Sequence, residues 1–144
     1  MTEDQLINKL KSIERLHAGA TTEGERDAAA RAVERIRARL KELEKLDPPV
    51  EYKFSMKDMY ARRLFVALLR RYGIRPYRFK GQRYTTVMAL VSKSFLDETL
   101  WPEFQALSSV LRDYLNEVTN RVITEGVHSD SSEAEVRSEP SRLI

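Results

Sequence analysis

Two adjacent prolines, Pro48 and Pro49, separate a helix-favouring first third of the sequence from a longer remainder of mixed pattern. Neither proline has a backbone N–H group to donate, and each disfavours the helical conformation in the residue before it. A helix that arrives from the N-terminal side must therefore end near Asp47. We expect residues 1–47 to form a helical hairpin, and residues 48–126 to form a unit of helix, β-hairpin and helix that packs with it as a single domain.

Within residues 1–47, apolar side chains recur every three or four positions, as they do along one face of an amphipathic helix. Thr22 followed by Glu25 is a capping box, in which the hydroxyl and the carboxylate each bind a free backbone N–H group. We therefore expect a first helix near the N-terminus and a second helix from this box to about Leu46. The two apolar stripes consist of Leu6, Leu10, Ile13 and His17, then Ala29, Val33, Ile36, Leu40 and Leu43.

The second helix is expected to be longer than the first, and its excess length needs a partner. At about 1.5 Å per residue, its far end extends roughly 10 Å beyond the first helix. The apolar side chains on that end require either the rest of the domain or a second copy of the chain. The sequence leaves both open, so a homodimer is one of two expectations.

Residues 48–126 mix strand-like alternation with helical spacing, so the expected fold class is α+β and mostly helical. Apolar and charged residues alternate over residues 50–54, which allows a short strand there. Ser55 and Asp58 are suited to cap a following helix, and Gly73 is suited to the position just after its end. One face of that helix is expected to carry Ala61, Phe65, Leu68 and Tyr72.

A β-hairpin is expected after this helix. Residues 75–79 and 83–91 are rich in aromatic and β-branched side chains, and they are joined by a turn that contains Gly81. The second run is apolar on both faces from Val87 onward. One face should therefore meet the helices, and the other should meet a further helix, a strand or a partner chain.

A long helix and a tail complete the expected organisation. Trp101 and Pro102 begin the helix, because proline is well tolerated at the first helical position. Gly126 follows its expected end, and the Ser- and Glu-rich residues 127–144 are expected to form a disordered tail. The apolar stripe of the helix consists of Leu100, Phe104, Leu107, Leu111, Tyr114 or Leu115, Val118 and Val122.

Missing residue types exclude several classes of function. The chain has no cysteine, which rules out disulfides, thiolate metal sites and a cysteine nucleophile. The two histidines, His17 and His128, lie far apart in the sequence, and neither comes with a second ligand or a nucleophile. No apolar run reaches the roughly 20 residues of a membrane span, and the N-terminus is acidic. We expect a cytoplasmic protein with no catalytic residues, no metal, no cofactor and no contact with a membrane.

Three short motifs have a chemical interpretation beside a structural one. Gly19 and Gly24 precede a helix, as in a phosphate-binding loop, but no Gly-Lys-Ser/Thr follows, so a capped turn is favoured. Glu51 and Lys53 match half of a metal-dependent nuclease site, but its partner aspartate is missing, so an amphipathic strand is favoured. Acidic residues crowd the start of the last helix, where the helix dipole favours them: Asp97, Glu98 and Glu103.

The charged residues are unevenly distributed, although the whole chain carries a formal net charge of only +3. Residues 57–83 hold nine basic side chains and one acid, Asp58, so this segment sums to +8 and the rest to −5. Lys and Arg neutralise phosphates, and aromatic rings stack on exposed bases. The candidate phosphate contacts are Arg62, Arg63, Arg70, Arg71, Arg75, Arg78, Lys80 and Arg83, with Tyr77 and Tyr84 available for stacking.

The N-terminal segment resembles a known family. Residues 9–16, the turn Gly19-Ala20-Thr21 and the residues that follow to Ala30 are similar to the opening of the bacterial and phage proteins grouped as domain-of-unknown-function family 2786. The following helix and the expected hairpin look like the portion that often comes after this opening. The family has no agreed activity, so the resemblance implies no catalytic residues. Its occurrence in phages and mobile elements implies binding to nucleic acid or to a host factor.

These observations predict a non-enzymatic nucleic-acid-binding accessory protein, phage- or mobile-element-related, that uses its Arg-rich helix and β-hairpin. They do not choose between DNA and RNA. The alternative is a protein-interaction module, such as a phage-type inhibitor or adaptor of a host nucleoprotein in an anti-defence role. Its interface would be the long helices and the strand that is apolar on both faces. An acidic protein partner or plain contact with solvent would also account for the basic segment.

Overall fold

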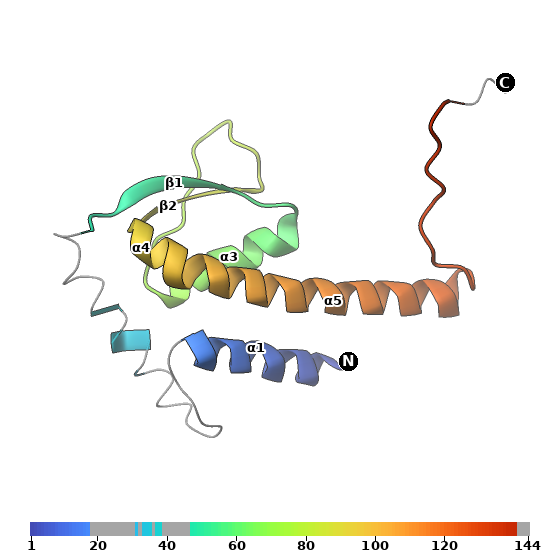
Figure 1. Cartoon of the computed structure of the whole chain (residues 1–144), viewed down its shortest axis with the longest axis horizontal. Helices are drawn as coiled ribbons and strands as arrows, with labels where there is room; N and C mark the ends of the chain where they lie inside the picture. The colour runs from blue at the N-terminus through green and yellow to red at the C-terminus, as the bar shows by residue number, and fades with distance from the viewer. Residues whose placement is uncertain (18–30, 32, 36, 39–46, 141–144) are drawn as a thin grey trace.

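A computed structural model describes residues 1–17, 31, 33–35, 37–38 and 47–140 of the chain (Figure 1). It confirms the expected α+β class, with mostly helical content and a small antiparallel sheet. In chain order the elements are α1 (Glu3–His17), β1 (Val50–Ser55), α3 (Met59–Arg71), β2 (Thr86–Val91), α4 (Lys93–Phe95), the π-helical turn η1 (Leu96–Leu100) and α5 (Trp101–Gly126).

The sheet consists of β1 and β2, which pair in antiparallel fashion with Ser55 opposite Thr86. This pairing confirms the short strand that the alternation over residues 50–54 allows. The expected pairing of strands 75–79 and 83–91 in a hairpin is wrong, because residues 75–79 form no strand and β2 pairs with β1 instead. A single antiparallel bridge joins Tyr77 to Met88, on the edge of β2 that faces away from β1. Pro76 has no N–H group to donate to a ladder, which helps to explain why this segment forms no strand.

The core lies between the sheet and the helices α3 and α5, which are both on one side of the sheet (Figure 1). Phe65 of α3 is fully buried, and its ring centroid lies 4.6 Å from that of Phe54 on β1 and 5.0 Å from that of Phe104 on α5. Aromatic pairs at these separations add favourable quadrupole contacts to the burial of apolar area. These rings fix the position of α3 relative to the sheet.

The helix α3 begins and ends as the sequence predicts. Asp58 is its N-cap, and one carboxylate oxygen accepts a hydrogen bond of 2.8 Å from the backbone N–H of Ala61. Ser55, the other expected cap, belongs to β1 instead. After the last turn, Gly73 adopts a φ of 73°, a conformation that side chains with a Cβ rarely take.

The helix α1 packs lengthwise and antiparallel against α5 (Figure 1). The N-terminal ammonium group is paired with Glu117, while Glu14 near the other end of α1 lies within 3.5 Å of Arg71 on α3. Leu6 is the buried residue of the expected first stripe. In the described residues, therefore, the clearest partner of α1 is the long C-terminal helix.

Most of the expected second helix lies outside the described residues, including the capping box of Thr22 and Glu25. The described positions 31, 33–35 and 37–38 are helical, and Val33 of the expected stripe is buried in the core. The stripe residues Ala29, Ile36, Leu40 and Leu43 and the turn Gly19-Ala20-Thr21 also lie outside the described residues.

The helix α5 starts at Trp101 as predicted, but helical structure begins earlier in the chain. Ser92 caps α4 by accepting a hydrogen bond of 3.4 Å from the backbone N–H of Phe95, and η1 continues directly into α5. After Gly126, residues 128–140 contain no helix or strand and are almost all exposed. None of the described helices combines the length and the apolar character needed to cross a membrane.

Candidate nucleic-acid interface

Two arginines from different elements meet on the ring of Tyr84. The guanidinium carbon of Arg62, on α3, lies 4.4 Å from the ring centroid, and that of Arg78 lies 5.3 Å from it. Tyr84 itself is half-exposed. A guanidinium over an aromatic face is attracted by the ring quadrupole and keeps its N–H groups available at the ring's edge. The ring therefore holds both cations against itself at the surface.

The segment between α3 and β2, residues 74–85, is here called the basic loop. Tyr77 exchanges backbone hydrogen bonds of 3.0 and 2.7 Å with Met88 of β2, which ties the loop to the sheet edge. Gln82 closes the tip, because its side-chain oxygen accepts a hydrogen bond of 2.8 Å from the backbone N–H of Phe79. Gly81 provides the positive φ of 85° that this turn requires. Hydrogen bonds to β2 and within its own tip therefore hold the basic loop in a defined conformation.

The hydroxyl of Tyr77 supplies a further anchor by donating a hydrogen bond to Glu51 of β1. This hydrogen bond to the carboxylate raises the pKa of the Tyr77 phenol. The contact also gives Glu51 a structural role that differs from the nuclease interpretation. Among the described residues, no cluster of three or more His, Asp or Glu side chains could hold a metal ion.

We define the basic surface as the exposed or half-exposed cations near the start of α3 and on the basic loop from Arg78 onward: Arg62, Arg63, Arg78, Lys80 and Arg83. In the part of the chain that the structure describes, none of these five cations forms an ion pair with a carboxylate. The acid closest to them in sequence, Asp58, has one oxygen engaged in the cap of α3. Among the described residues, therefore, no carboxylate neutralises the positive charge of this surface.

Arg70 and Arg75 are also exposed, but they lie at the other end of α3. Arg63 and Arg70 are seven positions apart on the helix and so share a face, about 10 Å apart along the axis. Arg75 borders a different hollow, which also includes Arg37 and Ile74. Arg70 and Arg75 therefore add positive charge beyond the basic surface, but neither contacts the ring of Tyr84.

Arg71 was expected to touch phosphates, and the structure corrects this expectation. Its guanidinium is ion-paired with the fully buried Glu103 of α5 and lies 3.5 Å from Glu14 of α1. The side chain is about one-fifth exposed. Arg71 follows Arg70 by about 100° around the helix, which turns it from the solvent face toward α5 and α1. It is a structural residue that joins three helices.

Glu103 is the residue whose role the sequence interpretation missed. It was grouped with Asp97 and Glu98 as an acid favoured by the helix dipole, and those two are indeed exposed. Glu103 instead accepts a hydrogen bond of 2.5 Å from the hydroxyl of Tyr72. Burial raises the pKa of that phenol. A signal was available in the sequence: Glu103 lies three residues after Leu100 and four before Leu107. Both leucines are buried, so this spacing puts Glu103 on the apolar face of the helix.

The remaining predicted positions differ in how far they are exposed. Tyr77 is half-buried and used for anchoring, so only Tyr84 of the two predicted stacking residues is half-exposed. His17 is half-buried in the last turn of α1. Phe79, half-exposed on the basic loop, was not predicted as a site residue, and the basic neighbours on either side of it were the available signal.

In comparisons with known proteins, no family model matches the chain, and neither a curated protein nor a solved structure is similar to it. These results leave the resemblance of the N-terminal segment to domain-of-unknown-function family 2786 as an expectation. The geometry of the basic surface is therefore the basis on which a function is assigned.

Proposed function

We propose that this protein binds nucleic acid through the basic surface, as an accessory factor without catalytic activity. The observation that carries the proposal is the group of five cations that has no carboxylate partner among the described residues. Two of them are held together on the half-exposed ring of Tyr84. A polyanion is the ligand class that this combination favours.

Phosphate binding also accounts for the preference for arginine on this surface. Four of the five cations are arginines, whose planar guanidinium groups can form paired hydrogen bonds with phosphate oxygens. Each phosphate that is neutralised releases a counterion and contributes about −0.9 to the log–log slope of affinity against salt for a duplex. The proposed binding should therefore weaken steeply as the salt concentration rises.

The alternative of a protein-interaction module depended in part on a strand that is apolar on both faces. In the structure, five of the six residues of β2 are buried and only Leu90 is exposed. The basic loop lies against the sheet at Met88, through Tyr77 and Gln82. Because one exposed leucine is far smaller than a typical protein interface, this alternative has less support.

The proposal is tested by fluorescence polarisation with labelled duplex and single-stranded oligonucleotides at low and moderate salt. The double variant Arg63→Glu with Arg78→Glu removes charge from both elements of the basic surface. We expect it to lower the affinity by about tenfold or more and to reduce the salt slope by about two.

The matched control is Lys9→Glu with Lys11→Glu, which changes the net charge by the same amount at exposed positions of α1. This control should retain affinity close to that of the wild type. Equal losses in the two double variants would show that only net charge matters. No binding of the wild-type protein to any oligonucleotide would overturn the proposal.

A further inference from the structure

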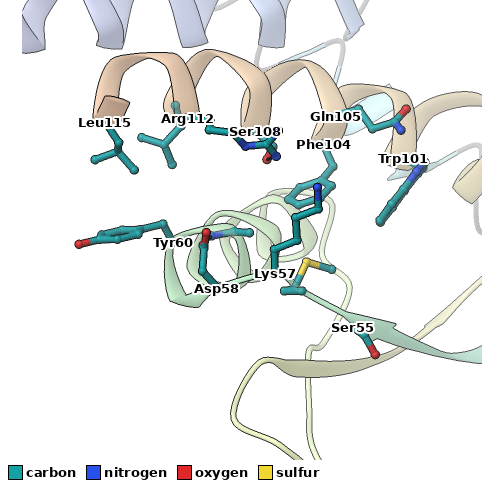
Figure 2. A pocket seen from close by; sticks show the side chains of 13 residues that line it. Ser55, Lys57, Asp58, Tyr60, Trp101, Phe104, Gln105, Ser108, Arg112 and Leu115 are labelled. Atoms are coloured by element: carbon teal, nitrogen blue, oxygen red, sulfur yellow. Dashed lines mark hydrogen bonds between the residues drawn. The ribbon is translucent and has the colours of Figure 1, made fainter. Parts of the chain in front are cut away.

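An open groove borders the basic surface, between the start of α3 and the middle of α5 (Figure 2). Its volume is about 350 Å³. The walls include Tyr60 and Ala61, which directly precede Arg62 of the basic surface. Trp101 and Phe104 of α5 line the opposite side. The groove is thus lined by the two residues of α3 that come directly before the first cation of the basic surface.

We propose that this groove accepts one unstacked base of a single-stranded nucleic acid, whose flanking phosphates contact the basic surface. The proposal rests on the proposed function and deepens it, because it names single strands rather than duplexes as the ligand. The volume is at the small end of the range for ligand sites, about 300–1,000 Å³. A single base suits that space, whereas a base pair within a stacked duplex has no way into it.

The chemistry of the lining suits a base. Tyr60 is 56% exposed, so its ring is available as a stacking surface at the edge of the groove. Gln105 presents a side-chain amide that has no hydrogen bond within the described residues, and an amide can both donate to and accept from a base edge. A base could thus bind through stacking and through polar recognition.

Charge complementarity favours nucleic acid over a neutral ligand. Lys57 and Arg112 lie on the two sides of the groove, and neither is paired with a carboxylate in the described part of the chain. Figure 2 shows Lys57 reaching from the start of α3 toward α5, the helix that carries Arg112. The only acid of the lining is Asp58, which caps α3. Phosphates on both sides of a bound base would meet cations.

The test uses Trp101, the only tryptophan of the chain, as a built-in reporter for the groove. Its fluorescence is followed while the protein is titrated with a single-stranded oligothymidylate of about ten nucleotides or with a duplex of the same length. A base that enters the groove should quench or shift the emission of Trp101, since stacked bases are efficient quenchers. We expect this change with the single strand and not with the duplex.

Two neighbouring substitutions on α5 then separate the groove from the rest of the surface. Ser108→Phe fills the groove, while Ser109→Phe places the same side chain at the next, exposed position, which does not line it. Ser108→Phe should lower the affinity for the single strand by about tenfold and abolish the change in Trp101 emission. Ser109→Phe should behave like the wild type, and circular dichroism should show that both variants are folded.

The outcomes distinguish this inference from the proposed function. If oligothymidylate binds in a manner that depends on Arg63 and Arg78, but Trp101 emission and the affinity of Ser108→Phe stay unchanged, the groove proposal is overturned and the proposed function stands. A change in Trp101 emission with an acidic peptide and none with oligothymidylate would also overturn it. If no oligonucleotide binds at all, both proposals fail.

Discussion

The hydroxyl of Tyr72, the residue that caps the C-terminal end of α3, donates a hydrogen bond of 2.5 Å to the carboxylate of Glu103 on α5. Arg71, the residue before Tyr72, is ion-paired with the same carboxylate. A fully buried carboxylate is tolerated only when such partners compensate for the water it has lost. The contacts of Glu103 with Arg71 and Tyr72 therefore link α5 to the end of α3, the helix that carries part of the basic surface.

Replacing Glu103 should destabilise the fold strongly. Glu103→Leu leaves the guanidinium of Arg71 without its buried partner, and removal of one member of a buried ion pair costs about 3 kcal/mol or more. We expect the free energy of unfolding in urea to fall by that amount. The control is Glu98→Leu, at an exposed position of η1, which should change it by less than about 0.5 kcal/mol. Similar values for the two variants would contradict the described role of Glu103.

Alkaline pH should weaken the fold through Tyr72. Burial raises the pKa of its phenol above the unfolded value of 10.0, so the folded state keeps a proton that the unfolded state loses. The contribution of Tyr72 is therefore complete below about pH 10 and is lost as the pH rises above that value. Urea unfolding at neutral and alkaline pH measures this loss. In Tyr72→Phe the decline should be smaller, and an equal decline would contradict the prediction.

The two arginines at position 63 and position 71 should separate binding from stability. Arg63→Glu changes an exposed side chain and should alter the free energy of unfolding by less than about 0.5 kcal/mol while it weakens oligonucleotide binding. Arg71→Glu places a third carboxylate beside Glu14 and Glu103, and it should lower the free energy of unfolding by about 3 kcal/mol or more. Thermal unfolding and polarisation on the same samples compare the two, and a stable Arg71→Glu protein would contradict the assignment.

The ring of Tyr84 should matter for binding more than for folding. Tyr84→Leu keeps an apolar side chain but removes the aromatic face that holds Arg62 and Arg78 together. Without the ring, Arg62 and Arg78 are no longer held in position before a ligand arrives, so the affinity for oligonucleotides should fall several-fold. Tyr84→Phe keeps the face and should bind like the wild type. A loss in the phenylalanine variant equal to that in Tyr84→Leu would show that the hydroxyl matters rather than the ring.

The helices α3 and α5 were predictable because their local signals agree with their packing. The cap at Asp58, the stop at Gly73 and the start at Trp101 all depend on neighbouring residues only, and the structure places each of them as predicted. The pairing of β2 with β1 was not predictable in this way. Both candidate partners of β2 have aromatic residues, and the choice depends on which partner can also bury a side chain such as Phe54 against the helices.

The candidate site was predictable as a charged segment but not residue by residue. Charge counting identifies residues 57–83, yet it gives Arg70 and Arg71 the same weight. Only the packing of α1 and α5 shows that Arg71 faces acids while Arg70 faces solvent. The groove beside α3 is lined by residues about fifty positions apart in the sequence, such as Tyr60 and Leu111. No local sequence pattern predicts that such residues lie close together.

Ser55 and Thr86 are paired across the sheet, and the next residues are joined by a hydrogen bond of 3.1 Å from the N–H of Met56 to the carbonyl of Thr85. The segment between β1 and β2, which contains α3 and the basic loop, is thus a long loop whose two ends are joined by hydrogen bonds. Closure of so long a loop is entropically unfavourable. The two strands should therefore pair late in folding, after α3 has packed against α5. Once the strands are paired, residues inserted at the loop tip near Gly81 should leave the pairing of β1 with β2 intact.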